Sequence, residues 1–432
     1  MKPSFDSIAR AAVDLWGADC VRPSSGVDEV DGCAPLAVLE PPNAATLAEM
    51  LGWANAQRLA VVPRGAGTKL QWGAAPLRVD VILSTACLNA PVDHCAGDLT
   101  ATVPAGASLA AVNQIIGREH QWLPLDPAAS DRATIGGIIA TNDSGPRRQK
   151  HGTPRDLIIG VEMALVDGRT AKAGGRVVKN VAGYDLGRLL CGSFGTLAVI
   201  TGATFKLTPS PPASRTIVAT VRNARSLANL ALAIAAAPLT PSAIELQSPP
   251  PRLLIRVETT GAAADRQAAA ALKLCREHGA EASTLVDEAE AAIWRGLEAD
   301  LSPTEGTLVR LAVLPTQVAD MLEHVERVSA TQAIDYRAGG RAALGVFFCR
   351  LGGSGKTGTR SDRESHAAMV EELRRKARAG GGSAVLVSAS PAVKAHVDPW
   401  GEVGDALPMM RAVKSRFDPN GILNPGRGAG GI

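Results

Sequence analysis

The stretch LAVVPRGAGTKL, residues Leu59–Leu70, joins a short apolar run to a glycine-rich turn. The apolar run predicts a buried strand that leads directly into the turn. Gly65 and Gly67 leave room for backbone N–H groups to converge on an anion, because no Cβ blocks the approach. A pyrophosphate group is the ligand that such a turn suits best, and Thr68 and Lys69 could add hydrogen-bond donors. A plain tight turn explains the same residues equally well, and the spacing is that of neither a Rossmann loop nor a P-loop.

A second glycine-rich segment, Thr134–Gly137, follows the stretch Leu123–Pro127 and precedes the polar run Thr141–Ser144 and Gly145. Paired glycines inside an apolar run mark a place where a large flat group approaches the backbone. A β-bulge followed by an Asx-turn would leave the same pattern. The segment therefore allows two interpretations.

A third segment runs from Lys179–Leu186 into Gly192–Ile200 and again combines glycines with an apolar run. Tyr184, one of two tyrosines in the chain, is expected to be a core residue with a hydrogen-bonded hydroxyl.

Around these segments, short strands mix with helices without the regular alternation of a doubly wound sheet, which indicates the α+β class. Leu47, Leu51 and Ala54 share one face of a predicted helix, and another helix is predicted over about Ser108–Gly117. The run Pro209–Pro212 marks a domain boundary. Beyond it, strands with crossing helices predict a separate mixed α/β domain, and no internal repeat is visible. We expect three parts: residues 1–212, 213–400 and 401–432.

The composition excludes several classes of protein. The 432 residues include 45 basic and 42 acidic ones, a balance that argues against nucleic acid as a partner. The longest apolar stretch is too short to span a bilayer, and the N-terminus lacks the apolar core of a secretory signal. The seven cysteines never form C-x-x-C, so we expect a reducing, cytoplasmic protein with neither disulfides nor an iron–sulfur cluster of its own. The seven histidines are isolated, which predicts no metal site.

In this order and at these separations, the three glycine-rich segments resemble the FAD-binding domain of the vanillyl-alcohol-oxidase superfamily, the PCMH-type FAD-binding domain. The similarity covers about residues 35–210 and a short C-terminal stretch, and within the superfamily it is to the FAD-binding subunits of bacterial glycolate oxidases. It implies a two-subdomain FAD-binding domain, then a mixed α/β cap, and a C-terminal tail that packs back on the FAD domain. The segments that carry it are Pro63–Thr68, Thr134–Gly137, Asn142–Pro146, Gly152–Asp156, Lys179–Leu186 and Asp418–Arg427.

The resemblance also implies how FAD is held. Backbone amides of Arg64–Thr68 would hold the pyrophosphate, Gly195 and Ile200 would lie near the adenosine, and Asn424 would return beneath the flavin ring. Covalent attachment in the superfamily often uses a histidine in the pyrophosphate loop; this loop has none, so noncovalent FAD is expected. The implied cofactor-binding residues are Pro63, Arg64, Gly65, Ala66, Gly67, Thr68, Lys69, Pro127, Thr134, Gly136, Gly137, Thr141, Asn142, Gly145, Gly195, Ile200 and Asn424.

The chain departs from the hydroxy-acid dehydrogenases of that superfamily at two places. Phe194 occupies a position where they usually have glutamate, and their H-x-G-D-G-N-x-H motif is absent. Oxidation of a 2-hydroxy acid needs a base for the hydroxyl proton and a cation for the carboxylate. We identify no base, so the catalytic residues are unknown. Arg310 could bind the carboxylate or be structural, and the basic run Arg147–His151 is a solvated loop by default or else a docking edge.

These observations favour an FAD-binding, electron-transferring subunit of a glycolate oxidase-like complex. The resemblance implies a second flavoprotein subunit and an iron–sulfur subunit as partners, and a small 2-hydroxy acid as substrate of the complex. The location is expected to be cytoplasmic, with peripheral attachment to the inner face of the membrane left open. Two alternatives remain: a self-sufficient FAD-dependent 2-hydroxy-acid dehydrogenase, and a noncatalytic interaction subunit that has lost the cofactor.

Overall fold

A computed structural model describes residues 4–177, 183–301, 306–352 and 360–432. The chain forms two compact units. The first consists of Met1–Gly145, Gly152–Ser210 and Glu402–Ile432, and the second of Pro146–His151 and Pro211–Gly401. Both mix helices and strands, so the α+β class is confirmed.

The first unit begins with a four-stranded sheet of order β1-β2-β4-β3, in which β4 runs parallel to both β2 and β3. Helix α2 connects β2 to β3; it begins because the side chain of Asn43 accepts a hydrogen bond from the Thr46 amide at 3.0 Å. Leu47, Leu51 and Ala54, predicted to share one face of a helix, are all buried on it. The elements are α1 (Phe5–Trp16), β1 (Val21–Pro23), β2 (Ala37–Leu39), α2 (Ala44–Ala56), β3 (Val61–Arg64) and β4 (Val81–Ser84).

The second half of this unit is an antiparallel sheet of order β5-β6-β10-β8-β9 with its own core around Phe205. Thr134–Thr141 is a helix and its cap, so the interpretation of its glycines as a strand bulge is wrong. Tyr184 is 90% exposed, so its assignment to the core is wrong too. The elements are β5 (Asp93–Cys95), β6 (Thr100–Pro104), α3 (Leu109–Ile116), β7 (Gln121–Trp122), α4 (Ile135–Thr141), α6 (Pro154–Leu157), β8 (Ile158–Ala164), β9 (Thr170–Gly174), α7 (Leu186–Leu190), β10 (Val199–Lys206) and β11 (Thr208–Pro209).

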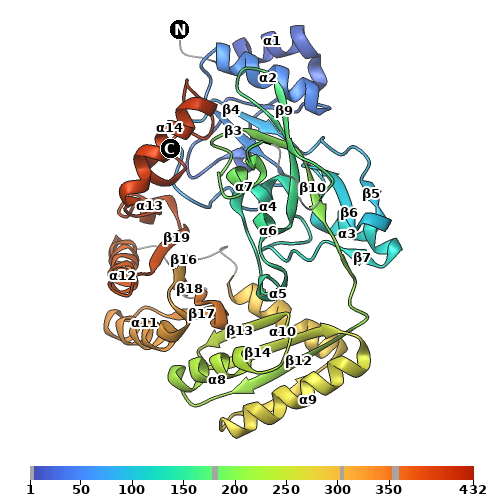
Figure 1. Cartoon of the computed structure of the whole chain (residues 1–432). Helices are drawn as coiled ribbons and strands as arrows, with labels where there is room; N and C mark the ends of the chain where they lie inside the picture. Colours follow the sequence, from blue (N-terminus) through green and yellow to red (C-terminus); the bar gives the residue numbers. More distant parts are fainter. Residues whose placement is uncertain (1–3, 178–182, 302–305, 353–359) are drawn as a thin grey trace. The chain divides into compact units, whose positions relative to one another are not determined.

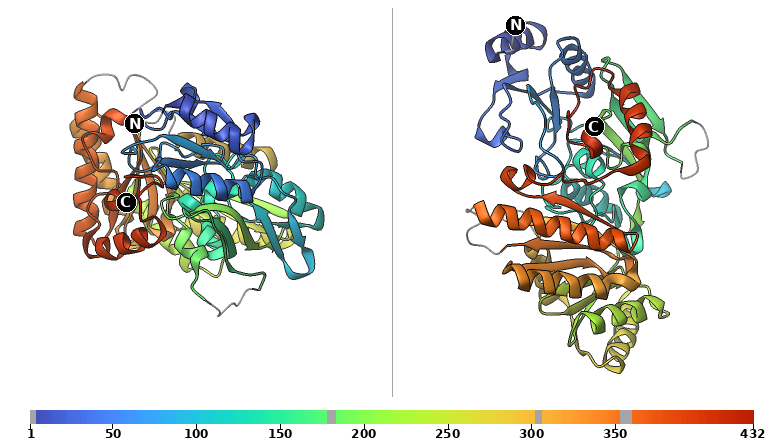
Figure 2. Two further views of the ribbon diagram at one scale, coloured as in Figure 1. Left: turned by 90° about the horizontal axis from the view of Figure 1, so that it is seen from above. Right: turned by 90° about the vertical axis from the view of Figure 1, so that its left-hand side faces the viewer.

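The C-terminal segment belongs to the first unit. After helix α14 (Leu407–Phe417), the tail extends along β3: the Val61 amide donates to the Ile422 carbonyl at 2.8 Å, and the Asn424 amide donates to the Val61 carbonyl at 2.9 Å. Figure 2 shows this red segment returning to the blue and green elements of the unit. The tail thereby extends the first sheet next to the strand that precedes the glycine-rich loop.

The second unit is built from two βαββαβ halves, an arrangement that the sequence did not reveal. Its eight-stranded antiparallel sheet has the order β15-β12-β14-β13-β17-β18-β16-β19, so the halves meet where β13 pairs with β17. The first half contains β12 (Ala213–Thr220), α8 (Ala224–Ala236), β13 (Ala243–Ser248), β14 (Arg252–Thr259), α9 (Gly261–Glu277) and β15 (Glu281–Leu285). The second contains β16 (Thr307–Ala312), α11 (Val318–Gln332), β17 (Tyr336–Arg341), β18 (Val346–Leu351), α12 (Arg360–Ala379) and β19 (Ser383–Ser388), and α13 (Pro391–Lys394) follows it.

Helix α10 (Asp287–Asp300) connects the halves and lies on the face of the sheet opposite α8 and α9 (Figure 1). Its Trp294 donates from Nε1 to Thr216 Oγ1 at 2.9 Å, whereas the next residue on that strand, Ile217, packs in the core with α8 and α9. The absence of a side chain at Gly339 lets α10 approach the sheet closely, because a Cβ there would lie 3.0 Å from the Leu297 side chain.

The basic run Arg147–His151 is part of the second unit and contains the short helix α5 (Arg148–His151). Arg147 forms a bidentate ion pair with the buried Glu258, with N–O distances of 2.8–3.2 Å, and Lys150 Nζ donates to the Glu258 carbonyl at 3.3 Å. The expectation of a solvated loop is therefore wrong for Arg147.

Within the described ranges, no helix has both the length and the apolar character needed to cross a membrane. All seven cysteines are free thiols.

Candidate cofactor site

A pocket of about 730 Å³, part of it open to solvent, lies within the first unit. Four segments surround it: the loop after β3, helix α4, the loop before β10 and the C-terminal tail. The lining residues are Pro63, Arg64, Gly65, Ala66, Gly67, Thr68, Lys69, Leu70, Thr85, Thr134, Gly136, Gly137, Ala140, Thr141, Phe194, Gly195, Ala198, Val199, Ile200, Asn424 and Arg427.

The loop after β3 packs against the start of α4 so closely that it requires glycine. A Cβ at Gly65 would lie 2.0 Å from Thr134 Oγ1, and Gly67 has a φ of +74°, which other residues rarely adopt. The loop can therefore present backbone N–H groups to a ligand without side chains in the way.

Helix α4 supplies a second glycine surface. Gly136 lies against Ala105, where a Cβ would be 3.0 Å from the alanine Cβ, and its amide donates to the Ala105 carbonyl at 2.9 Å. The Thr141 hydroxyl donates a hydrogen bond to the Gly137 carbonyl at 2.8 Å. The residues of α4 that line the pocket, Gly136, Gly137, Ala140 and Thr141, all have small side chains or none.

The loop before β10 contains two consecutive residues of left-handed backbone, Phe194 with φ +55° and Gly195 with φ +66°. A bulky residue at positive φ is uncommon and costs conformational energy, so the surrounding contacts must hold it. The Phe194 amide donates to the Ala140 carbonyl at 2.8 Å, and its carbonyl accepts from Asn424 Nδ2 at 2.5 Å.

Asn424 closes the pocket from the tail. Only 3% of its surface is exposed, and its Oδ1 has no hydrogen-bond partner among the described residues. Arg427, 4% exposed, donates to the carbonyls of Leu70 and Trp72, and its burial lowers its pKa to about 10. The tail thus contacts both glycine-rich loops.

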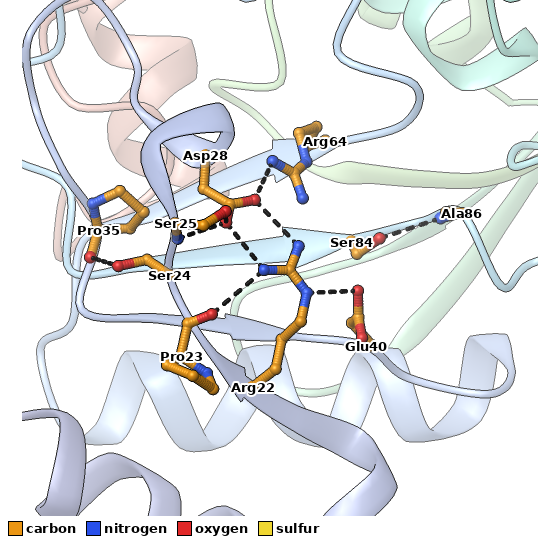
Figure 3. Close-up of polar contacts among 10 residues, drawn as sticks. All are labelled: Arg22, Pro23, Ser24, Ser25, Asp28, Pro35, Glu40, Arg64, Ser84 and Ala86. Atoms are coloured by element: carbon orange, nitrogen blue, oxygen red, sulfur yellow. Dashed lines mark hydrogen bonds and ion pairs between the residues drawn. The ribbon is translucent and has the colours of Figure 1, made fainter.

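Two cationic side chains of the first loop are ion-paired with buried aspartates. Arg64 Nη1 lies 2.6 Å from Asp28 Oδ1, and Asp28 is fully buried (Figure 3). Lys69 Nζ lies 3.2 Å from Asp143 Oδ2. Arg22 forms a second ion pair with Asp28 and holds its carboxyl pKa well below the usual range.

Most of the residues predicted from the sequence come together in this pocket. Those that do not line it are Pro127, Asn142 and Gly145. Gly145 packs closely against Asp126, where a Cβ would be 1.9 Å from the carbonyl oxygen. Lys179–Ala182, part of the third predicted segment, lie outside the described residues.

Sequence reasoning missed Leu70, Thr85, Ala140, Phe194, Ala198, Val199 and Arg427 as lining residues. The position of Phe194 between Ser193 and Gly195 was a signal that could have identified it. Thr85 gave none, because it approaches the loop only through pairing of β4 with β3.

Outside the pocket, Arg310 lies exposed on β16 of the second unit. The described part of the chain contains no group of three or more histidine, cysteine, aspartate or glutamate side chains suited to a metal ion.

The pocket suits a long ligand with an anionic centre and a flat ring. Gly65 and Gly67 leave the lining loop without side chains at two positions, and Asn424, which lines the same pocket, has a buried Oδ1 acceptor with no hydrogen-bond partner among the described residues. These features fit FAD.

Comparison with known proteins decides the family. Residues 35–174 match the FAD binding domain family, and residues 245–427 match the C-terminal domain of FAD-linked oxidases. The chain belongs to the FAD-linked oxidases with a PCMH-type FAD-binding domain. The resemblance predicted from the glycine-rich segments is confirmed: FAD is the cofactor, and the chain is an FAD-dependent oxidoreductase.

The relatives of this FAD-linked oxidase include three curated proteins of related activity. Glycolate oxidase subunit GlcD of Bacillus subtilis is 29% identical over 422 residues, which cover 91% of this chain and 88% of GlcD. D-lactate dehydrogenase of Archaeoglobus fulgidus is 40% identical over 172 residues, 40% of this chain and 38% of the relative. Glycolate oxidase subunit GlcE of Escherichia coli is 37% identical over 133 residues, 31% of this chain and 38% of GlcE.

Among solved structures, an alkyldihydroxyacetonephosphate synthase superimposes with a TM-score of 0.74 at 14% identity, over 98% of this chain and 86% of the other. At that identity the likeness concerns the fold alone.

Proposed function

We propose that this chain is the FAD-binding subunit of a glycolate oxidase-like complex that oxidises a small 2-hydroxy acid, and that it holds FAD for electron transfer. The observation that carries the proposal is the pocket, in which two glycine-rich loops and Asn424 converge on one space. Similarity to glycolate oxidase subunits and to a D-lactate dehydrogenase supports the substrate class. Residues 1–212 with 401–432 would form the FAD-binding domain, and residues 213–400 the cap.

In this proposal the backbone amides of Arg64–Thr68 hold the diphosphate, and Thr134, Gly136 and Gly137 lie along the flavin. Gly195 and Ile200 lie toward the adenosine. Bound FAD supplies a two-electron acceptor that can pass electrons on. The protein contributes orientation, exclusion of water and hydrogen bonds. Pro127, Asn142 and Gly145 would support the lining from behind.

FAD is held noncovalently in this account. The residues that line the pocket include no histidine, which supports reversible binding. Acid precipitation of the purified protein should release all flavin into the supernatant. Yellow colour left in the washed pellet would refute this part.

The proposed partners are a second flavoprotein subunit and an iron–sulfur subunit, with the complex in the cytoplasm or attached to the inner face of the membrane. Affinity purification of the tagged chain from its native host, from both soluble and membrane fractions, tests the assembly. We expect an iron–sulfur protein and a second flavoprotein in near-equal amounts. Recovery of the chain alone from both fractions would contradict the proposal.

Anaerobic reduction separates a subunit from a self-sufficient dehydrogenase. The flavin of the isolated chain should stay oxidised when glycolate or D-lactate is added, and the flavin of the complex should bleach. Rapid bleaching of the isolated chain would instead establish a self-sufficient dehydrogenase. In that case Arg310→Met, which removes the exposed cation of β16, is the first variant to test for a raised KM.

A further inference from the structure

We propose that Asp28 and Asp143 are positioning residues of the cofactor site: they neutralise Arg64 and Lys69, so that backbone N–H groups, not these two cations, bind the diphosphate. The inference rests on the proposed placement of FAD in the pocket. It assigns a role to two residues that lie outside the glycine-rich loop in the sequence.

Each oxygen of the buried Asp28 carboxylate accepts hydrogen bonds from at least two groups. Its Oδ1 accepts from Arg64 Nη1 at 2.6 Å and from Arg22 Nη2 at 3.0 Å, and its Oδ2 accepts from Arg22 Nη1 and from the Ser25 amide, both at 2.8 Å. Figure 3 shows the two guanidinium groups on the same carboxylate, with Glu40 on the other side of Arg22. The two arginines and two carboxylates form a cluster without net charge.

Arg64 is fixed at its backbone as well. Its carbonyl accepts from the Thr85 amide at 2.8 Å, and its side chain is 12% exposed. With both ends held, the residue fixes the point at which β3 turns into Gly65. A loop that is ordered before the ligand arrives loses less conformational entropy on binding.

Lys69 repeats this arrangement at the far end of the loop. Its Nζ lies 3.2 Å from Asp143 Oδ2 and donates to the Ala128 carbonyl at 3.1 Å, and both side chains are less than 10% exposed. The same Asp143 oxygen accepts from the Ala128 amide at 2.9 Å. At each end of the loop, a buried aspartate therefore holds one cationic side chain in place and neutralises its positive charge.

This arrangement predicts an unusual dependence of FAD binding on salt. Ions screen attraction between accessible charges, whereas hydrogen bonds from neutral amides are affected little. The Kd for FAD should therefore change by less than about twofold between about 50 and about 500 mM KCl. Direct contact of the diphosphate with Arg64 or Lys69 would instead weaken binding about tenfold or more over that range.

The test is titration of apo-protein with FAD, followed by flavin fluorescence, for the wild type and matched variants. Asp28→Asn leaves Arg64 charged beside the diphosphate, so its Kd should become salt-dependent by at least about fivefold. In Arg64→Met and in the double variant Asp28→Asn/Arg64→Met, the Kd for FAD should be as independent of salt as in the wild type. Arg22→Met is the control, because it removes the other partner of Asp28 and leaves the Arg64 ion pair in place. Asp143→Asn and Lys69→Met should behave like Asp28→Asn and Arg64→Met.

A steep salt dependence of the wild type that Arg64→Met or Lys69→Met abolishes would overturn the inference. This arm needs no aspartate variant, so it decides the question even if Asp28→Asn does not fold. Failure of the site assignment would look different: apo-protein would not bind FAD at all, or Gly65→Val would bind it normally.

Discussion

At the scale of single residues, the pocket depends on atoms that are absent as much as on those present. Gly65 has no Cβ where one would touch Thr134, and Asn424 has a buried Oδ1 acceptor with no hydrogen-bond partner among the described residues. The glycines could be predicted from the sequence because few residues tolerate such contacts. The roles of Arg427 and Thr85 could not be predicted, because both depend on pairing between segments far apart in the sequence.

Asn424→Ala should weaken FAD binding about 10- to 100-fold, the value of one buried hydrogen bond. Asn424 has a φ of +44°, so the alanine variant also strains the backbone. Asn424→Gly removes the side chain without that strain and is the matched control. Both variants should lose affinity equally in equilibrium titrations. Normal affinity in Asn424→Gly would assign the effect to the backbone and contradict a role for the amide.

His151 gives a prediction about pH. Burial, aided by the charges of Lys150 and Arg147, lowers its pKa to about 4, although Glu258 opposes the shift. In acid the unfolded chain takes up this proton near pH 6.5, before the folded protein does, so stability falls between about pH 6.5 and 4. His151→Gln should reduce that slope by up to about 1.4 kcal/mol per pH unit. Urea unfolding at several pH values measures it, and an unchanged slope would refute the assignment.

At the scale of secondary-structure elements, the C-terminal tail connects the parts of the site. Lys414 Nζ lies 2.6 Å from Asp418 Oδ2 and donates to the Thr196 carbonyl at 2.7 Å, while Asp418 accepts from the amides of Ile422 and Leu423. One buried carboxylate therefore holds the turn that directs the tail along β3.

Asp418→Ala should destabilise the first unit by about 3 kcal/mol, because it leaves Lys414 buried without its partner. It should also weaken FAD binding, since Asn424 and Arg427 follow this turn. Urea unfolding and FAD titration measure the two effects. Ser415→Ala, at an exposed position on the same helix, should change stability by less than about 0.5 kcal/mol. Equal effects of the two variants would contradict the role of the turn.

The elements found from the sequence are those with strong patterns. Helix α3 (Leu109–Ile116) follows the predicted range Ser108–Gly117 to within one residue at each end, and the buried strand predicted before the glycine-rich turn is β3 (Val61–Arg64). Helix α10 and strand β15 were missed. Few of their residues are buried, so neither shows a clear apolar period.

At the scale of the whole chain, the backbone crosses between the two units at 145/146, 151/152, 210/211 and 401/402. The short insertion Pro146–His151 belongs to the second unit through the ion pair of Arg147 with Glu258. Burial alone would raise the pKa of the Glu258 carboxyl, but the hydrogen-bonded guanidinium of Arg147 keeps that pKa below its usual value. The duplicated βαββαβ arrangement of that unit could not be read from the sequence, because its halves share a pattern of elements and not a pattern of residues.

Arg147→Met should destabilise the second unit by about 3 kcal/mol, because it leaves the Glu258 carboxylate buried alone. Arg147→Met/Glu258→Met should recover much of that loss, since an apolar pair can replace a buried ion pair. Thermal unfolding followed by tryptophan fluorescence measures both. Arg169→Met, which breaks an exposed ion pair with Asp167, should have almost no effect. A double variant no more stable than Arg147→Met would contradict the account.

The central claim is that this chain holds FAD in the glycine-lined pocket of its first unit. The most direct measurement is the flavin content, by absorbance, of desalted wild-type protein and of Gly65→Val, after both are purified with added FAD. The account predicts close to one FAD per wild-type chain and almost none in Gly65→Val, while the circular dichroism of both proteins stays alike. A colourless wild type, or a Gly65→Val variant that retains its yellow colour, would contradict it.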